Sequence, residues 1–187
     1  MSSHHIVKEK QEPALYLHDL GSFSEEYLGQ LLEWSPTLIV NADIYEKVIS
    51  LGLKVDVIAD SGTALFPQEN TRVLKGPGDT YNTVLNYLIT EKYPAVNIID
   101  EGGKLSDLSF YLPKINIVLF SGGTKSYAVK SGFKVWKPGG SRFSIEVISY
   151  FEATNLQQQT EQEFEVVRDG FVEFNFSTDY LLLTEHL

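Results

Sequence analysis

The chain has 187 residues, of which 43% are hydrophobic and 21% charged, so it is long enough to bury a core and too apolar to be disordered. Its formal net charge of −10, without any cluster of Lys and Arg, argues against binding to nucleic acid or to an anionic membrane. The absence of cysteine excludes disulfides, thiolate catalysis and Cys-ligated zinc.

The first 13 residues are polar and carry no apolar segment typical of a signal peptide, and no apolar run is long enough to span a bilayer. We therefore expect a cytoplasmic protein, with a frayed arm before its first strand. Histidine is scarce, and His18 is the only one that lies away from the chain ends. This argues against a Ser/His/Asp hydrolase or a histidine metal cluster.

The first predicted strand covers residues 14–17, and a helix capped by Ser24 follows, with Glu25 and Glu26 in its first turn. Residues 38–63 then form the unit around which we interpret the chain. An apolar run at 38–40, a helical segment at 44–51 that ends at Gly52, and a β-branched run at 55–58 indicate a right-handed strand–helix–strand crossover. Polar residues follow both strands, at the edge where open α/β sheets bind ligands: Asn41, Asp43, Asp60 and Ser61.

Further along, the pattern predicts a short strand at 71–74, a helix opened by the loop 76–80, and a strand at 95–99. A short helix at 105–112 and a strand at 115–120 complete this part. Beyond residue 121 the helical period disappears, and short alternating runs indicate half-buried antiparallel strands. We therefore predict an N-terminal parallel α/β sheet domain at 14–120, followed by a small C-terminal β-sandwich domain at 121–187.

Three local motifs carry candidate chemistry, and each has an ordinary structural interpretation. The loop that contains Gly76 and Gly78 could present backbone N–H groups to a phosphate, but a turn capped by Asp79 or Thr80 is favoured roughly two to one. Asp60 could hold Mg²⁺, and a turn-forming role is about as probable. Asp107 reads by default as a solvated carboxylate in a short helix.

Taken together, these features resemble the thiamin pyrophosphokinase family over roughly residues 14–183. The similarity rests on the order α/β then β, on residues 51–58, on Asp79 and Thr80 at a helix start, on residues 94–97, on Gly103 and Lys104 with Asp107, and on Ser144. The resemblance implies an α/β nucleotide domain with a β-sandwich, a homodimer with its sites at the subunit interface, and pyrophosphoryl transfer from ATP to thiamin with Mg²⁺.

By position, the resemblance implies roles for nine residues. Catalytic positions are Asp60, Asp79 and Asp107, of which Asp60 and Asp79 would also bind the metal; the cofactor-binding positions are Asp43, Gly76, Gly78, Thr80, Lys104 and Ser144.

The departures from the family pattern bear on activity. One carboxylate, Asp60, stands where the family has two for magnesium, the acid-rich segment before the helix has become residues 75–80, and Leu108 replaces a histidine. The late Ser-Asn-Glu that helps to enclose thiamin has no counterpart near residues 167–171. Because phosphoryl transfer depends on metal and cations that neutralise phosphate charge, we interpret the chain as a degenerate, non-catalytic relative that retains binding of a nucleotide, a thiamin-like molecule or a partner.

Two alternatives remain at this stage. In the first, Asp43, Asp60, Asp79 and Asp107 rebuild a magnesium site and the enzyme is active. In the second, the chain is a structural or interaction module whose aromatic-rich β half forms a dimer surface.

Overall fold

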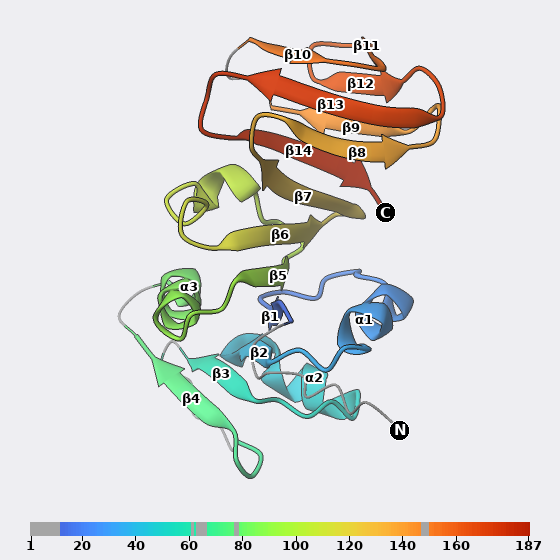
Figure 1. Ribbon diagram of the computed structural model, residues 1–187. Coiled ribbons are helices and arrows are strands. Elements are labelled where there is room, and N and C mark those ends of the chain that lie inside the picture. Colours follow the sequence, from blue (N-terminus) through green and yellow to red (C-terminus); the bar gives the residue numbers. More distant parts are fainter. Residues whose placement is uncertain (1–11, 61, 63–66, 77–78, 147–149) are drawn as a thin grey trace, which may run out of the picture.

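The computed structural model describes residues 12–60, 62, 67–76, 79–146 and 150–187, which form one large sheet and one small sheet (Figure 1). The large sheet has 11 strands in the order β11-β12-β9-β14-β7-β6-β5-β1-β2-β3-β4, and the small sheet has three, in the order β10-β13-β8.

The strands from β4 to β6 in this order are parallel. They are β1 (Ala14–Leu17), β2 (Leu38–Asn41), β3 (Val57–Asp60), β4 (Arg72–Lys75), β5 (Ala95–Ile99) and β6 (Asn116–Ser121). Successive strands build outward from β1 to β4, and the chain then returns to the other side of β1 to form β5 and β6. The strand order therefore reverses between β1 and β5, which makes this the topological switch point of an open α/β sheet.

Helices cover both faces of the parallel part. The helical segments are α1 (Glu25–Leu32), η1 (Ala42–Ile44), α2 (Tyr45–Ser50), α3 (Thr80–Thr90) and η2 (Leu105–Leu108). In Figure 1, α3 lies on one side of the sheet, and α1 and α2 lie on the other. Alternate residues of β1 serve the two layers: Tyr16 packs in the cluster that contains Leu85 of α3, whereas Leu15 packs with Leu28 of α1.

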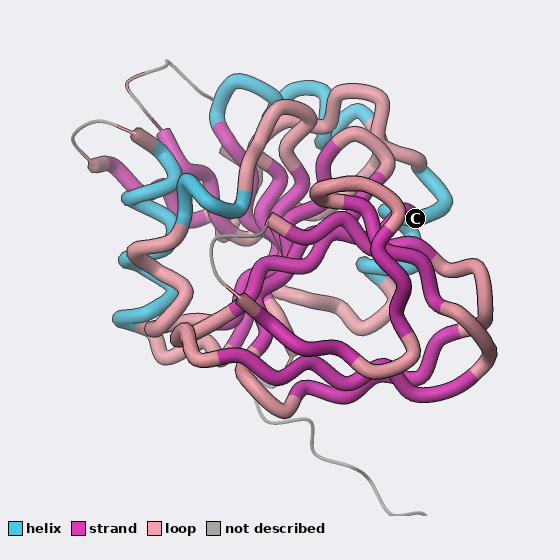
Figure 2. The backbone as a smooth tube through the Cα atoms, turned by 90° about the horizontal axis from the view of Figure 1, so that it is seen from above, coloured by secondary structure: helices cyan, strands magenta, loops and turns pink. Residues whose placement is uncertain are grey.

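The antiparallel strands complete both sheets. They are β7 (Thr124–Val129), β8 (Phe133–Lys137), β9 (Arg142–Ile145), β10 (Phe151–Ala153), β11 (Leu156–Gln158), β12 (Glu163–Val166), β13 (Gly170–Phe176) and β14 (Leu181–His186). Fully buried Phe143 of the large sheet and Phe174 of the small sheet meet edge to face, with ring centroids 5.7 Å apart. These rings belong to a third core cluster that fills the space between the two sheets. Figure 2 shows the molecule from above, with the strands of the C-terminal part nearest to the viewer.

The mixed α/β class is confirmed, and the strand predicted at residues 95–99 coincides with β5. Other boundaries differ. β3 extends through Asp60, and the helix predicted at 105–112 is a 3-10 segment at Leu105–Leu108. β10 and β11 have only three residues each, too few for an alternating pattern to predict them.

A single sheet runs through the position of the predicted domain boundary. β6 pairs in parallel with β5 and antiparallel with β7. Within the described segments, helices occur only before residue 121, so the predicted loss of helical structure beyond that point is confirmed. The division into two domains at 121 itself stays a prediction. In the described part, no helix has both the length and the apolar character needed to cross a membrane.

Candidate functional site

The switch point brings together the segments that follow β1 and β5. His18 and Asp19 follow β1, and the backbone N–H groups of both donate to the carbonyl of Ile99, the last residue of β5, at 2.9 and 3.2 Å. These bonds fix His18 beside Asp100, the next residue after β5. In open α/β sheets this edge is the preferred ligand site.

The amino end of α3 covers this edge. Asp79 is the N-cap, and its Oδ1 accepts the N–H of Tyr81 at 3.0 Å. Thr80, the first helical residue, is buried, and its Oγ1 accepts a hydrogen bond from the Tyr16 hydroxyl at 3.1 Å. That hydroxyl also lies 2.9 Å from Nδ1 of His18. The helix start is therefore tied to β1 through buried polar side chains.

Tyr81 connects the helix to β5. Its hydroxyl donates to Oδ2 of Asp100 at 2.5 Å, and its ring stacks on His18 with centroids 4.4 Å apart and planes at 29°. Burial raises the pKa of Tyr81 above its usual range, and the bond to Asp100 raises it further. The Tyr81 phenol consequently stays protonated and acts as a donor to the carboxylate.

The charges of three carboxylates act on the buried hydroxyl of Tyr16. Burial raises the pKa of this phenol, and the negative charges of Asp79, Asp100 and Asp43 raise it further, although the bond with Thr80 opposes them. Asp43 follows β2, Asp79 caps α3, and Thr80 is bonded to Tyr16 of β1, so these three predicted site residues lie at the same edge. Their two carboxylates and Asp100 make the edge acidic.

The acids at the edge are held by hydrogen bonds to their own loops. Oδ1 of Asp60, a residue that is 6% exposed, accepts the N–H of Gly62 at 2.8 Å. Asp100, 9% exposed, accepts from Gly102 at 3.4 Å in addition to the Tyr81 hydroxyl. Both bonds are typical of turns formed by Asp. The ordinary interpretations of Asp60 as a turn former and of Asp79 as a helix cap are thus confirmed.

The predicted phosphate loop is only partly described. Gly76 lies against α3, where a Cβ would collide with the side chain of Thr83, so close packing accounts for this glycine. Gly78 and Ser61 lie outside the described residues.

Two other predicted residues meet elsewhere. Lys104, the residue before η2, and Ser144 of β9 line a pocket of about 500 Å³ at the carboxyl end of β6. Its walls also carry a set of hydroxyl groups, from Ser106, Ser121, Thr124, Ser126 and Thr184. Asp107 is exposed in η2 and does not line this pocket, as its default interpretation predicted.

Comparison with known proteins places this architecture. No model of a protein family matches the sequence, and no curated protein does either. Solved structures do match. Thiamine pyrophosphokinase from Bacillus subtilis superposes with a TM-score of 0.68 at 11% identity, over 94% of this chain and 99% of that one. The Candida albicans enzyme gives 0.66 at 9% identity, over 93% and 90%, and the yeast enzyme 0.61 at 10%, over 96% and 88%.

The chain has the thiamin pyrophosphokinase fold. The resemblance inferred from the sequence framework is thereby confirmed at the level of fold. At 9–11% identity, the comparison does not carry the activity of those enzymes to this chain.

A thiamin pyrophosphokinase fold implies Mg²⁺, so we tested whether the residues at the edge fit one. Mg²⁺ takes octahedral oxygen ligands, commonly one or two carboxylates together with substrate phosphates and water. Within the described residues, no three His, Cys, Asp or Glu side chains gather in a way that could hold a metal ion. The four-carboxylate cluster of Asp43, Asp60, Asp79 and Asp107 is therefore not formed. Binding of Mg²⁺ by Asp60 and Asp79, together with substrate phosphates and water, stays a prediction.

Sequence reasoning missed four members of the edge: Tyr16, His18, Tyr81 and Asp100. Two of them carried a usable signal, because His18 and Asp100 follow predicted strands just as Asn41 and Asp60 do. What could not be read from the sequence was that β5 lies next to β1.

Proposed function

We propose that this chain is a non-catalytic relative of the thiamin pyrophosphokinases that binds a cationic, thiamin-like molecule at the switch-point edge. The observation that carries the proposal is the hydrogen bonding of the carboxylates at this edge. Asp60, Asp79 and Asp100 each accept hydrogen bonds from their own loop or helix, and no metal cluster forms among the described side chains.

The charge of the edge supports a cationic ligand over a polyphosphate. Phosphoryl-transfer sites neutralise phosphate oxygens with metal ions and fixed cations. The edge instead carries Asp43, Asp79 and Asp100, whose negative charges act on Tyr16. Such carboxylates repel ATP and attract a positively charged ring. The stacked pair of His18 and Tyr81 adds aromatic surface next to these charges.

Calorimetry of the purified protein with thiamin, Mg-ATP and Mg-AMP in turn tests the proposal. We expect heat from thiamin alone. Asp100→Asn should weaken thiamin binding roughly fivefold to tenfold, since it removes one charge beside the ligand. Asp107→Asn removes an equal charge from the exposed η2 segment and should leave the affinity unchanged.

A second measurement separates binding from catalysis. Conversion of thiamin to its diphosphate is followed with Mg-ATP, and with Mn²⁺ in place of Mg²⁺. We expect no turnover in either case. Turnover abolished by Asp60→Ala would establish an active enzyme with a rewired metal site, and the absence of thiamin heat would refute the ligand assignment.

A further inference from the structure

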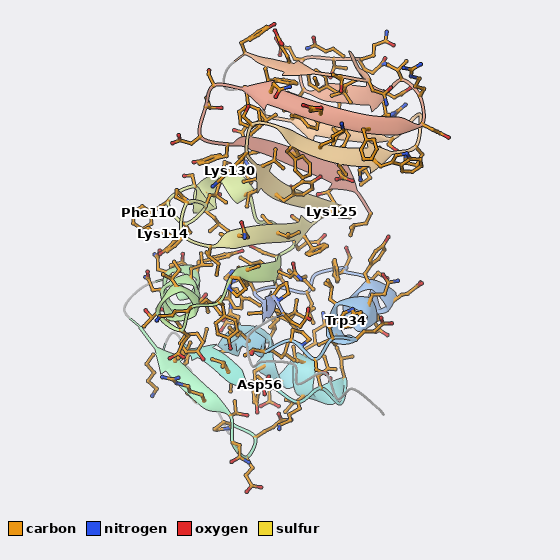
Figure 3. The ribbon with its side chains drawn as sticks, in the orientation of Figure 1. Trp34, Asp56, Phe110, Lys114, Lys125 and Lys130 are labelled. Atoms are coloured by element: carbon orange, nitrogen blue, oxygen red, sulfur yellow. The ribbon has the colours of Figure 1, made fainter. Side chains whose placement is uncertain are left out.

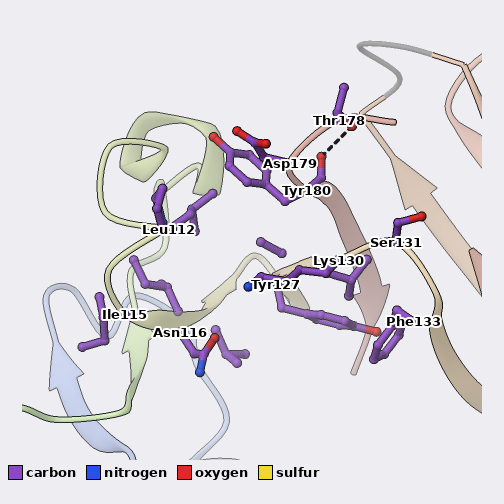
Figure 4. Close-up of a pocket in the computed structure, with 15 residues that line it drawn as sticks. Leu112, Ile115, Asn116, Tyr127, Lys130, Ser131, Phe133, Thr178, Asp179 and Tyr180 are labelled. Atoms are coloured by element: carbon purple, nitrogen blue, oxygen red, sulfur yellow. Dashed lines mark hydrogen bonds between the residues drawn. The ribbon is translucent and has the colours of Figure 1, made fainter. Parts of the chain in front are cut away.

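A larger pocket lies at the opposite end of β6 from the hydroxyl-lined one. It has a volume of about 890 Å³ and is lined by the start of β6, the end of β7, the turn into β8 and the segment before β14 (Figure 4). Ser121 at the carboxyl end of β6 lines the smaller pocket, whereas Asn116 at its amino end lines this one. The two pockets are therefore separate, and the larger one is remote from the switch point.

The walls of this pocket suit a flat apolar body. Tyr127, Phe133 and Tyr180 contribute aromatic rings, and Leu112 and Ile115 contribute aliphatic surface. The Tyr127 hydroxyl donates to Glu185, so its polar end is occupied and its ring is left as wall. The volume lies within the range of roughly 300–1,000 Å³ that is usual for small-molecule sites.

The pocket also holds charges that the protein does not pair. Neither the Lys130 ammonium nor the Asp179 carboxylate has a hydrogen bond or ion pair with another described residue. In Figure 4 the Lys130 side chain runs across the pocket toward the side lined by Leu112 and Ile115, and Asp179 lies beside Tyr180. Both side chains are exposed, and an exposed ammonium that extends over an apolar pocket can serve as the counter-charge for an anion bound there.

A second cation lies next to the pocket. Lys114 sits between the lining residues Pro113 and Ile115, with its Nζ 3.3 Å from the centroid of the Phe110 ring. Lys114 and Lys130 are on the same side of the molecule in Figure 3. Lys114 and Lys130 outnumber the one carboxylate that lines the pocket, Asp179, so in a protein of net charge −10 this place favours an anionic group.

We propose that this pocket binds a small molecule with a flat aromatic body and one anionic group, which pairs with Lys130. A hydrogen-bond donor on the ligand would meet Asp179 at the other side. The proposal does not depend on the function assigned to the switch-point edge, because the residues differ and the expected ligand charge is opposite.

Two fluorescent probes with one aromatic body test the charge requirement. Anilinonaphthalene sulfonate carries an anionic group, and N-phenyl-1-naphthylamine is its neutral counterpart. We expect the full-length protein to bind the sulfonate more tightly. Lys130→Met should weaken sulfonate binding about tenfold and change binding of the neutral probe less than about twofold.

Matched variants control for net charge and for folding. Lys47→Met removes an equal charge at an exposed position of α2 and should leave both affinities unchanged. Tyr180→Ala removes an aromatic wall and should weaken both probes alike. Circular dichroism and the melting temperature confirm that each variant is folded. Equal losses in Lys130→Met and Lys47→Met, or equal losses of both probes in Lys130→Met, would overturn the proposal.

Competition identifies the anionic group. Naphthyl phosphate and naphthoate are added to the sulfonate complex at equal concentrations, and the stronger competitor shows whether the pocket prefers a phosphate or a carboxylate. If neither displaces the sulfonate, the pocket is not the anion site that we propose.

Discussion

The hydrogen bond between Tyr81 and Asp100 provides a sharp test of the switch-point edge. Tyr81→Phe removes the hydroxyl alone and leaves the ring that stacks on His18. Asp100, 9% exposed, then keeps only the longer bond from Gly102, at 3.4 Å. A hydrogen bond to a charged group contributes about 1.5–3 kcal/mol to stability, so we expect Tyr81→Phe to lower the free energy of unfolding by about 2 kcal/mol at pH 7. For a protein of this size, that loss lowers the melting temperature by roughly 6 °C.

The pH dependence of this loss distinguishes the bond from a general packing defect. The native pKa of Tyr81 is raised above the value near 10 that the unfolded chain has, first by burial and then by the bond to Asp100. A group with a raised native pKa contributes stability that is fully present below the unfolded pKa and declines as pH rises above it. Because of this phenol, the free energy of unfolding of the wild type falls by about 1.4 kcal/mol per pH unit above about pH 10, whereas that of the variant does not.

The difference in free energy of unfolding between wild type and Tyr81→Phe should consequently fall from about 2 kcal/mol at pH 7 to about 0.6 kcal/mol at pH 11. Urea unfolding followed by circular dichroism at both values measures it. Tyr150→Phe is the matched control, because exposed Tyr150 donates to Glu152 at 3.0 Å in the same manner, and its loss should leave the melting temperature unchanged. A gap that is the same at both pH values would refute the reasoning.

Three further predictions concern catalysis, packing and assembly. Thiamin diphosphate formation with Mg-ATP should stay far below the turnover of about 10 per second that is typical of enzymes, because the described acids include no group of three that could hold a metal ion between donor and acceptor; a coupled assay near that rate would contradict it. Phe174→Ala should cost about 3–5 kcal/mol in urea unfolding, since this fully buried ring contacts the rings of Phe133, Phe143 and Phe151, whereas Phe171→Ala, at an exposed position of the same strand, should cost far less. Light scattering at tens of micromolar, an ordinary concentration for such contacts, should give a homodimer that covers exposed Trp136 and Phe171, and a monomer would count against it.

The local elements of this fold follow from short-range patterns in the sequence. The sequence predicts a strand at residues 95–99, and β5 has the same bounds. A short apolar run with turns on both sides leaves little choice of where the strand begins and ends. The place of Asp79 and Thr80 before an apolar helical period predicts a cap at one of them, and Asp79 caps α3. The resemblance to thiamin pyrophosphokinases likewise rested on the order of such elements along the chain.

Which elements lie side by side was decided only by the tertiary structure. The return of the chain across β1 to form β5 creates the switch point, and it joins His18 to Tyr81 and Asp100, residues far apart in sequence. The continuation of one sheet from β6 into β7 opens a pocket at each end of β6. Strand pairing depends on burying whole faces and on long-range hydrogen bonds, and neither leaves a periodic signal within one segment. The sequence therefore predicts the local helices and strands and several of the acids at the edge. The order of the strands in the sheet decides which of these side chains come together in the site.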